Sequence, residues 1–184
     1  MRKIKGFKLD IRPHEFRRRA KKAGFDLALE EFSDPALGGT LDQLTKAVTP
    51  AVLFDTFGHP DPDQPLLSPL PGLAYSVILA TLGEGHIRIG PEKPGFDFWP
   101  IFVDTALDSC VRFASALIAD EAQKDNCELS PLTALHDAMA LDAALRKLDG
   151  AKLGVSAADG RLSPSASLVV SLSWLARSKA KGRK

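Results

Sequence analysis

The chain has 184 residues, of which 45% are hydrophobic and 26% are charged. These proportions are typical of a globular protein and exclude a disordered or fibrous chain, and the length suits one domain. The net charge is only +1, yet 15 of the 24 Lys and Arg residues lie in the first 22 and the last eight positions. The basic ends favour contact with an acidic protein partner, whereas the acidic body between them disfavours binding to nucleic acid.

The sequence shows no sign of a membrane segment, a disulfide framework or a metal site. The two cysteines, Cys110 and Cys127, are too few for a disulfide framework or a four-ligand zinc site. Met1 is followed at once by charged residues, and the longest uncharged apolar stretch, Leu73–Leu82, is about half of a membrane-spanning length. We therefore expect a cytoplasmic protein whose cysteines are reduced and buried.

The N-terminal part of the chain predicts a strand, a basic helix and a second helical region. The alternation of apolar and polar residues over Ile4–Ile11 is typical of an edge strand. Glu15–Ala23 is expected to form a short helix that ends at Gly24. The arginines at positions 17–19 of this helix are either a solvated face or a contact for phosphate or an acidic partner. Leu27–Val48 shows interrupted helical spacing.

The middle of the chain predicts strands on either side of a long loop. Val52–Phe57 is a short strand candidate, and the proline-rich stretch Gly58–Gly72 is interpreted as an extended loop and a candidate mobile flap. Leu73–Leu82 is the clearest strand, and its nearly continuous apolar character predicts burial on both faces.

The C-terminal half predicts two long helices and two strands. Ile87–Ile89 alternates briefly before a Gly-Pro loop. Apolar residues recur at helical spacing over Ile101–Gln123 and again over Leu132–Leu148. Leu153–Ala157 and Ser167–Trp174 are then expected to be strands.

These elements predict a single α+β domain over residues 1–176, followed by a flexible basic tail over residues 177–184. The strands lie far apart in the sequence, so hairpins alone cannot build the sheet. Each long helix has one apolar stripe, and we expect both to pack on one face of a mostly antiparallel sheet. The strands expected in this sheet are Ile4–Ile11, Leu73–Leu82, Leu153–Ala157 and Ser167–Trp174.

No catalytic residue is named by the sequence. The four histidines are scattered singly, and neither a Gly-rich phosphate loop nor a Gly-x-Ser-x-Gly motif is present. Asp104 and Asp108 lie four residues apart on one helix, which is the spacing of a carboxylate pair and equally that of a solvated helix face.

Several motifs follow one another in a fixed order. Residues 81–83 (Thr-Leu-Gly) end a buried strand, and residues 129–131 (Leu-Ser-Pro) precede an amphipathic helix. The strand Leu153–Ala157 follows that helix, and Leu162–Ser167 leads into the final strand. These motifs resemble the activation domain of vitamin B12-dependent methionine synthase, and especially the short standalone relatives of that domain.

The resemblance implies an activation-domain fold and a function in the reductive activation and methylation of a corrinoid enzyme. The implied cofactor is S-adenosylmethionine, and cobalamin is reached only through a corrinoid-binding partner protein. The implied role is at most that of an accessory methyl-transfer or reactivation domain.

A ligand pocket is expected where the loop Cys127–Thr133 meets the turn Arg161–Ser167. Proline in both segments fixes the backbone, and small hydroxyl side chains can orient a polar ligand. The alternative is that these serines only cap the adjoining helix and strand. The candidate cofactor-binding residues are Glu128, Ser130, Pro131, Thr133, Arg161, Ser163, Ser165 and Ser167.

The chain departs from the family in this same loop. The family has an arginine followed closely by glycine-tyrosine-proline, whereas residues 127–133 here read Cys-Glu-Leu-Ser-Pro-Leu-Thr. A second hypothesis is therefore a non-catalytic interaction module of the same fold that has lost S-adenosylmethionine binding. It would dock its basic N-terminal helix and C-terminal tail on an acidic partner.

Overall fold

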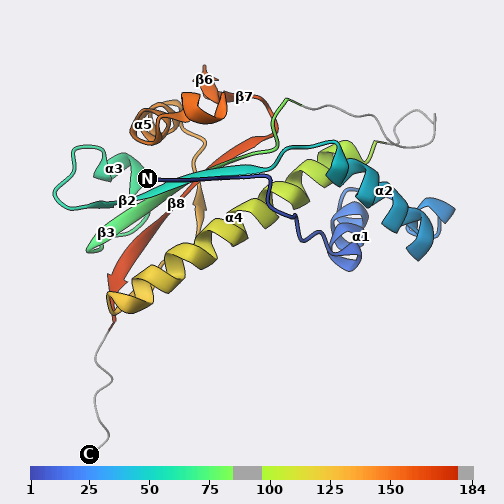
Figure 1. The fold of residues 1–184 in the computed structure, drawn as a ribbon, viewed down its shortest axis with the longest axis horizontal. Helices are drawn as coiled ribbons and strands as arrows, with labels where there is room; N and C mark the ends of the chain where they lie inside the picture. Colours follow the sequence, from blue (N-terminus) through green and yellow to red (C-terminus); the bar gives the residue numbers. More distant parts are fainter. Residues whose placement is uncertain (85–96, 178–184) are drawn as a thin grey trace, which may run out of the picture.

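The computed structural model describes residues 1–84 and 97–177. The alternation expected at Ile87–Ile89 and the basic tail from residue 178 onward lie outside this range. The described residues form an α+β structure built on an antiparallel sheet (Figure 1), which confirms the predicted class. The strand order is β1 (Arg2–Lys5), β2 (Ala51–Gly58), β3 (Ala74–Thr81), β8 (Ser167–Ala176) and β4 (Cys127–Leu129), and β5 (Thr133–Ala134) also pairs with β8.

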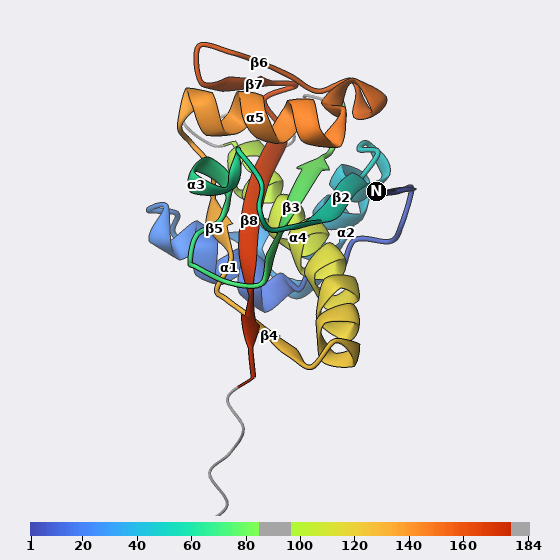
Figure 2. The ribbon, with the colours of Figure 1, turned by 90° about the vertical axis from the view of Figure 1, so that its left-hand side faces the viewer.

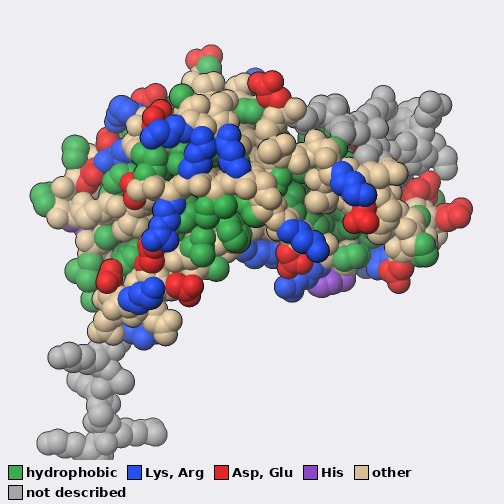
Figure 3. All heavy atoms as spheres, in the orientation of Figure 1, with side chains coloured by type: hydrophobic (Ala, Val, Ile, Leu, Met, Phe, Trp, Pro, Cys, Tyr) green, Lys and Arg blue, Asp and Glu red, His purple; other side chains and the backbone are tan. Residues whose placement is uncertain are grey.

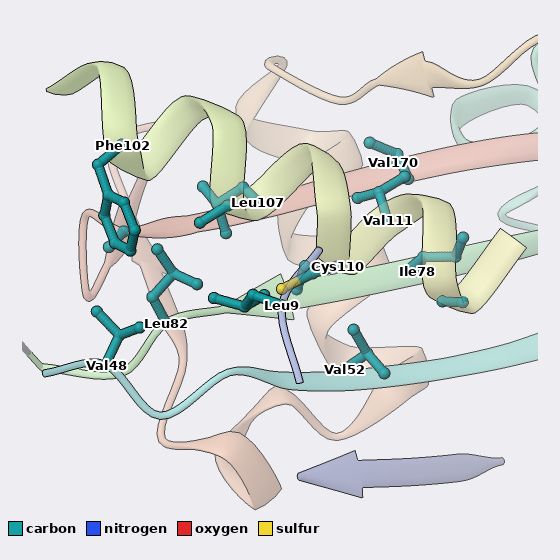
Figure 4. Packing of buried hydrophobic residues seen from close by; sticks show 14 of the residues in the cluster. Leu9, Val48, Val52, Ile78, Leu82, Phe102, Leu107, Cys110, Val111 and Val170 are labelled. Carbon is teal, nitrogen blue, oxygen red and sulfur yellow. The ribbon is translucent and has the colours of Figure 1, made fainter. Parts of the chain in front are cut away.

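One face of the sheet is covered by α4 (Trp99–Lys124). Side chains alternate between the two faces of a strand, and one set of alternating residues from β2, β3 and β8 faces this helix. The helix contributes apolar residues that recur every three or four positions. Figure 4 shows this layer, with Phe102, Cys110 and Val111 of α4 packed against Val52, Ile78 and Val170.

The opposite face is covered by α5 (Ala138–Leu148), which runs across the strands (Figures 1 and 2). The other alternating set, including Leu53, Val77 and Val169, packs against it. The prediction that both long helices lie on one face is therefore wrong. Because β2, β3 and β8 are apolar on both faces, each face needs its own cover.

Three predicted elements have different bounds in the structure. Leu153–Ala157 does not join the main sheet. Its first residue is the end of the short 3-10 helix η2 (Gly150–Leu153), and its last two residues belong to β6 (Ser156–Ala158), which pairs with β7 (Arg161–Ser163). Strand β1 ends before Gly6, whose φ of 66° turns the chain away. Helix α5 begins only after Asp137, because that carboxylate accepts hydrogen bonds from the first amides of the helix.

A helical layer at the N-terminus extends the core along the first half of α4. It consists of α1 (Pro13–Lys22), the 3-10 helix η1 (Glu30–Phe32) and α2 (Asp34–Lys46). Phe16, Phe32 and Phe98 meet edge-on, with ring centroids 5.2 and 5.5 Å from Phe98. Edge-to-face contacts of this kind stabilise buried aromatic clusters.

The proline-rich loop between β2 and β3 is anchored to the sheet. It contains α3 (Gln64–Leu67), in which Leu67 is fully buried. The amide of Leu70 donates to Ser173 Oγ at 2.9 Å, and the amide of Leu73 donates to the carbonyl of Trp174 at 2.8 Å. The end of the candidate flap therefore packs along β8.

Replacing Gly72 by alanine is expected to destabilise the protein by about 1–3 kcal/mol, because the new Cβ would overlap the backbone carbonyl of Trp174. Chemical denaturation monitored by circular dichroism measures this change. Gly39→Ala is the matched control, since Gly39 lies in α2 with open space around its Cα. It should stabilise the protein by about 0.5–1 kcal/mol. Equal stability of the two variants would contradict this close approach.

Candidate functional site

The loop that was expected to bind a ligand supports β8 from one side. Ser130 is buried, and its Oγ accepts a hydrogen bond from the amide of Ser173 at 2.8 Å. The amide of Ser130 donates in return to the carbonyl of Ser173. Glu128 forms an ion pair with Arg177 at 3.4 Å. Pro131 and Thr133 are exposed, and Thr133 pairs with Ser171 in the sheet.

The second expected segment lies toward the other end of β8. Ser167 is buried, and its Oγ donates to Thr81 Oγ1 at 2.8 Å. Arg161, Ser163 and Ser165 are exposed in or beside the β6–β7 hairpin. Ser130 is hydrogen-bonded to Ser173 of β8, and Ser167 lies six residues earlier in the same strand. Six residues of an extended strand span about 20 Å. The structure therefore does not bring Ser130 and Ser167 together, and ligand binding by these segments stays a prediction.

A cavity of about 670 Å³ opens instead where the sheet extends past the end of α4. We call it the sheet-end groove. Its volume lies in the range of small-molecule sites. A smaller hollow of about 220 Å³ continues it toward the N-terminus and shares Arg2, Thr56 and Glu121 with it. The groove is lined by Arg2, Thr56, Gly58, Leu73, Ala74, Glu121, Lys124, Asp125, Cys127 and Trp174.

Charged groups of both signs stand at the rim of the sheet-end groove. Arg2 forms an ion pair with Glu121, whereas the exposed side chains of Lys124 and Asp125 have no ion pair within the described residues. Figure 3 shows side chains of both charges around this end of α4, at the lower left of the view. An unpaired cation next to an unpaired anion complements a zwitterionic group.

The apolar part of the groove is held rigidly by the sheet. Trp174 Nε1 donates to Ser76 Oγ at 2.7 Å, and Ser76 Oγ is 2.7 Å from Thr56 Oγ1. These hydrogen bonds fix the indole ring, of which only an edge reaches the groove, because Trp174 is 5% exposed. Leu73 is 60% exposed beside it. The sequence carried only one signal for this groove, a tryptophan in the final strand.

The arginines of α1 divide into structural and exposed groups. Arg17 donates to the carbonyl of Phe32 and pairs with Asp34, so it ties α1 to α2. Arg18 is exposed and has no ion pair within residues 1–84 and 97–177, and the same holds for Lys21 and Lys22. The triplet is therefore only partly a solvated face.

Asp104 and Asp108 both pair with Arg19, which assigns the spaced carboxylates a structural role. Arg19 also contacts Glu15, a buried carboxyl that accepts from Arg112 as well. Burial alone would raise the pKa of Glu15, but the charges and hydrogen bonds of Arg112 and Arg19 outweigh burial and lower it. This network joins α1 to α4.

A second ion-pair cluster holds the β2–β3 loop against α5. Lys147 Nζ lies 2.6 Å from Asp61 and 3.6 Å from Asp63, and its ammonium also stands 4.6 Å from the centre of the Phe57 ring. Burial raises the pKa of Asp61, yet the hydrogen bonds from Lys147 and from the Asp63 amide lower it below its ordinary value. Burial and the two nearby carboxylates raise the pKa of Tyr75.

The two cysteines are free thiols and buried, as predicted. Burial raises the pKa of Cys110 to about 12, which makes it a poor nucleophile. Within the described ranges, no three His, Cys, Asp or Glu side chains are grouped as a metal site. The same residues include no helix that is both long and apolar enough to cross a bilayer.

A scan against models of known protein families finds no match for this chain, and a search of curated proteins finds none either.

Stability should fall on acidification as Asp61 titrates. Its folded-state pKa lies below the ordinary value of 3.8, so its contribution is complete above pH 3.8 and is lost as the pH falls toward the lowered value. Urea unfolding between pH 2 and 7 measures this loss. Asp61→Asn should flatten that part of the profile, whereas Asp142→Asn, which removes an exposed carboxylate of α5, should leave it unchanged. A profile unaltered by Asp61→Asn would contradict the role of the Lys147 contact.

Proposed function

We propose that this chain is an accessory protein of the activation-domain type that binds S-adenosylmethionine for a partner enzyme carrying a corrinoid. Two things support the proposal: the order of motifs between Leu129 and Leu172, and the sheet-end groove. The observation that carries it is the groove itself, which places charges of both signs beside an indole edge in a cavity of small-molecule size.

The residues of the sheet-end groove fit the chemistry of this ligand. S-adenosylmethionine has an ammonium and a carboxylate at one end, a sulfonium in the middle and an adenine at the other end, and it supplies a methyl group when bound. Asp125 and Glu121 offer carboxylates for the cationic groups, and Lys124 offers an ammonium for the carboxylate. Leu73, which is exposed beside the edge of the Trp174 indole, offers apolar surface for the adenine.

The charged side chains of the sheet-end groove bind and orient the ligand, and the corrinoid chemistry belongs to the partner protein. We therefore assign this chain a presenting role, in which the open side of the groove faces the partner. Lys21, an exposed cation of α1, is available for an acidic surface of that partner.

A second candidate is a protein-interaction module of the same fold that binds no S-adenosylmethionine. It is favoured by the hydrogen bonds of Ser130 and Ser167, which use hydroxyl groups that the resemblance assigned to the ligand. The ion pair of Glu128 with Arg177 also favours this candidate, because it uses a carboxylate that was expected to bind the ligand. A direct binding measurement separates the two candidates.

Isothermal titration calorimetry with S-adenosylmethionine is expected to show one site in the wild-type protein. Asp125→Asn should weaken binding by about fivefold to tenfold, because a charge-assisted contact is lost. Asp120→Asn, which removes an exposed carboxylate of α4 that does not line the groove, should change the affinity by less than about twofold. S-adenosylhomocysteine lacks the sulfonium charge and should bind more weakly.

Absence of binding by the wild-type protein would favour the interaction module. Equal losses in Asp125→Asn and Asp120→Asn would remove the groove from the proposal, because the effect would then be a general charge effect.

A further inference from the structure

A second cavity, of about 540 Å³, lies between α1 and the beginning of α4. We call it the α1–α4 cavity. The sheet-end groove lies at the other end of α4, about 20 residues or 30 Å along the helix. The cavity is therefore separate from the site of the proposed function. Its lining consists of Arg18, Arg19, Lys22, Ala23, Pro100, Ile101 and Asp104.

The lining of the α1–α4 cavity carries two cations without an ion pair. Of its three cations, Arg19 is already paired with Asp104, the one carboxylate of the lining, and with Asp108 and Glu15 nearby. Arg18 and Lys22 are exposed, and neither has an ion pair or hydrogen bond within the part of the chain that the structure describes. Two free cations on one cavity wall, four residues apart on one helix, repel each other unless an anion lies between them.

The wall of the α1–α4 cavity is fixed by contacts within the chain. The guanidinium of Arg19 is held by Asp104 and Asp108. At the beginning of α4 the amide of Trp99 donates to Asp97 Oδ1 at 2.9 Å, so the first turn of this helix already has an anionic partner. The cations that remain for a ligand are Arg18 and Lys22.

We propose that the α1–α4 cavity binds the phosphate group of a small phosphorylated molecule. Arg18 and Lys22 contact the phosphate oxygens, and Arg19 is held by its acidic partners as a fixed wall of the site. Ala23, Pro100 and Ile101 supply the apolar surface on which the rest of the ligand lies. The cavity is concave and of small-molecule size, which favours such a ligand over the flat acidic surface of a protein.

Inorganic pyrophosphate is the probe for this site, used with the full chain in calorimetry. Arg18→Gln combined with Lys22→Gln is expected to weaken pyrophosphate binding by about tenfold or more, because both phosphate contacts are lost. The matched control is Lys8→Gln combined with Lys21→Gln. It removes two exposed cations that do not line the cavity, one in the segment before α1 and one in α1, and it should change the affinity by less than about twofold.

A second measurement locates the bound probe. Amide chemical shifts in nuclear magnetic resonance should change at Ala23 and Ile101 on addition of pyrophosphate and should stay constant at Lys124, in the distant groove. The thermal midpoint of both double variants is expected to match that of the wild type, since none of the four side chains has a partner among the described residues. S-adenosylmethionine binding should be the same in all three proteins, so the two proposals fail independently.

Three results would overturn the phosphate site. The first is an absence of pyrophosphate binding by the wild-type protein up to about 10 mM. The second is an equal loss of affinity in the two double variants, which would indicate a diffuse basic surface. The third is binding of polyglutamate or of an RNA oligonucleotide in place of pyrophosphate, which would assign the basic side chains to a macromolecular partner.

Discussion

Strands β2, β3 and β8 bury apolar side chains on both faces, so water has to be excluded from each side of the sheet. A helix can cover only the face against which its apolar stripe lies. The chain meets this requirement with α4 on one side and α5 on the other, and it adds α1 and α2 where α4 extends past the sheet. Both cavities arise at the ends of α4, where the helix and its neighbours stop covering one another.

The strongest local patterns gave correct predictions. β3 lies within the expected Leu73–Leu82, because its apolar run is bounded by glycines, and α4 follows its helical spacing to within two residues at either end. The α+β class followed from these elements. The continuous apolar character of Leu73–Leu82 means that both faces of this strand have to be shielded from water. Packing both long helices on one face would leave the other face exposed, so that prediction was inconsistent with the pattern of the strand.

Other features depended on contacts between distant residues and could not be predicted from local patterns. Thr133 joins the sheet because Ser171 lies opposite it, although its own neighbourhood suits a helix. Arg17 and Arg19 are structural because the fold brings Asp34 and Asp104 next to them, whereas Arg18 has no such partner among the described residues. The sheet-end groove is likewise assembled from five separate segments, so no short motif could reveal it.

The two borders of the sheet also decide how the protein behaves toward copies of itself. Along one border, β1 presents the basic residues Arg2, Lys3 and Lys5. Along the other border, the strand beside β8 is interrupted between β4 and β5. In this interruption Pro131 has no amide proton to donate, and the amide of Ser173 donates to the side-chain hydroxyl of Ser130 and not to a backbone carbonyl. A further strand would meet like charge on one side and an interrupted ladder on the other. The sheet is thereby protected from growing by intermolecular strand pairing, the first step toward fibrous aggregation.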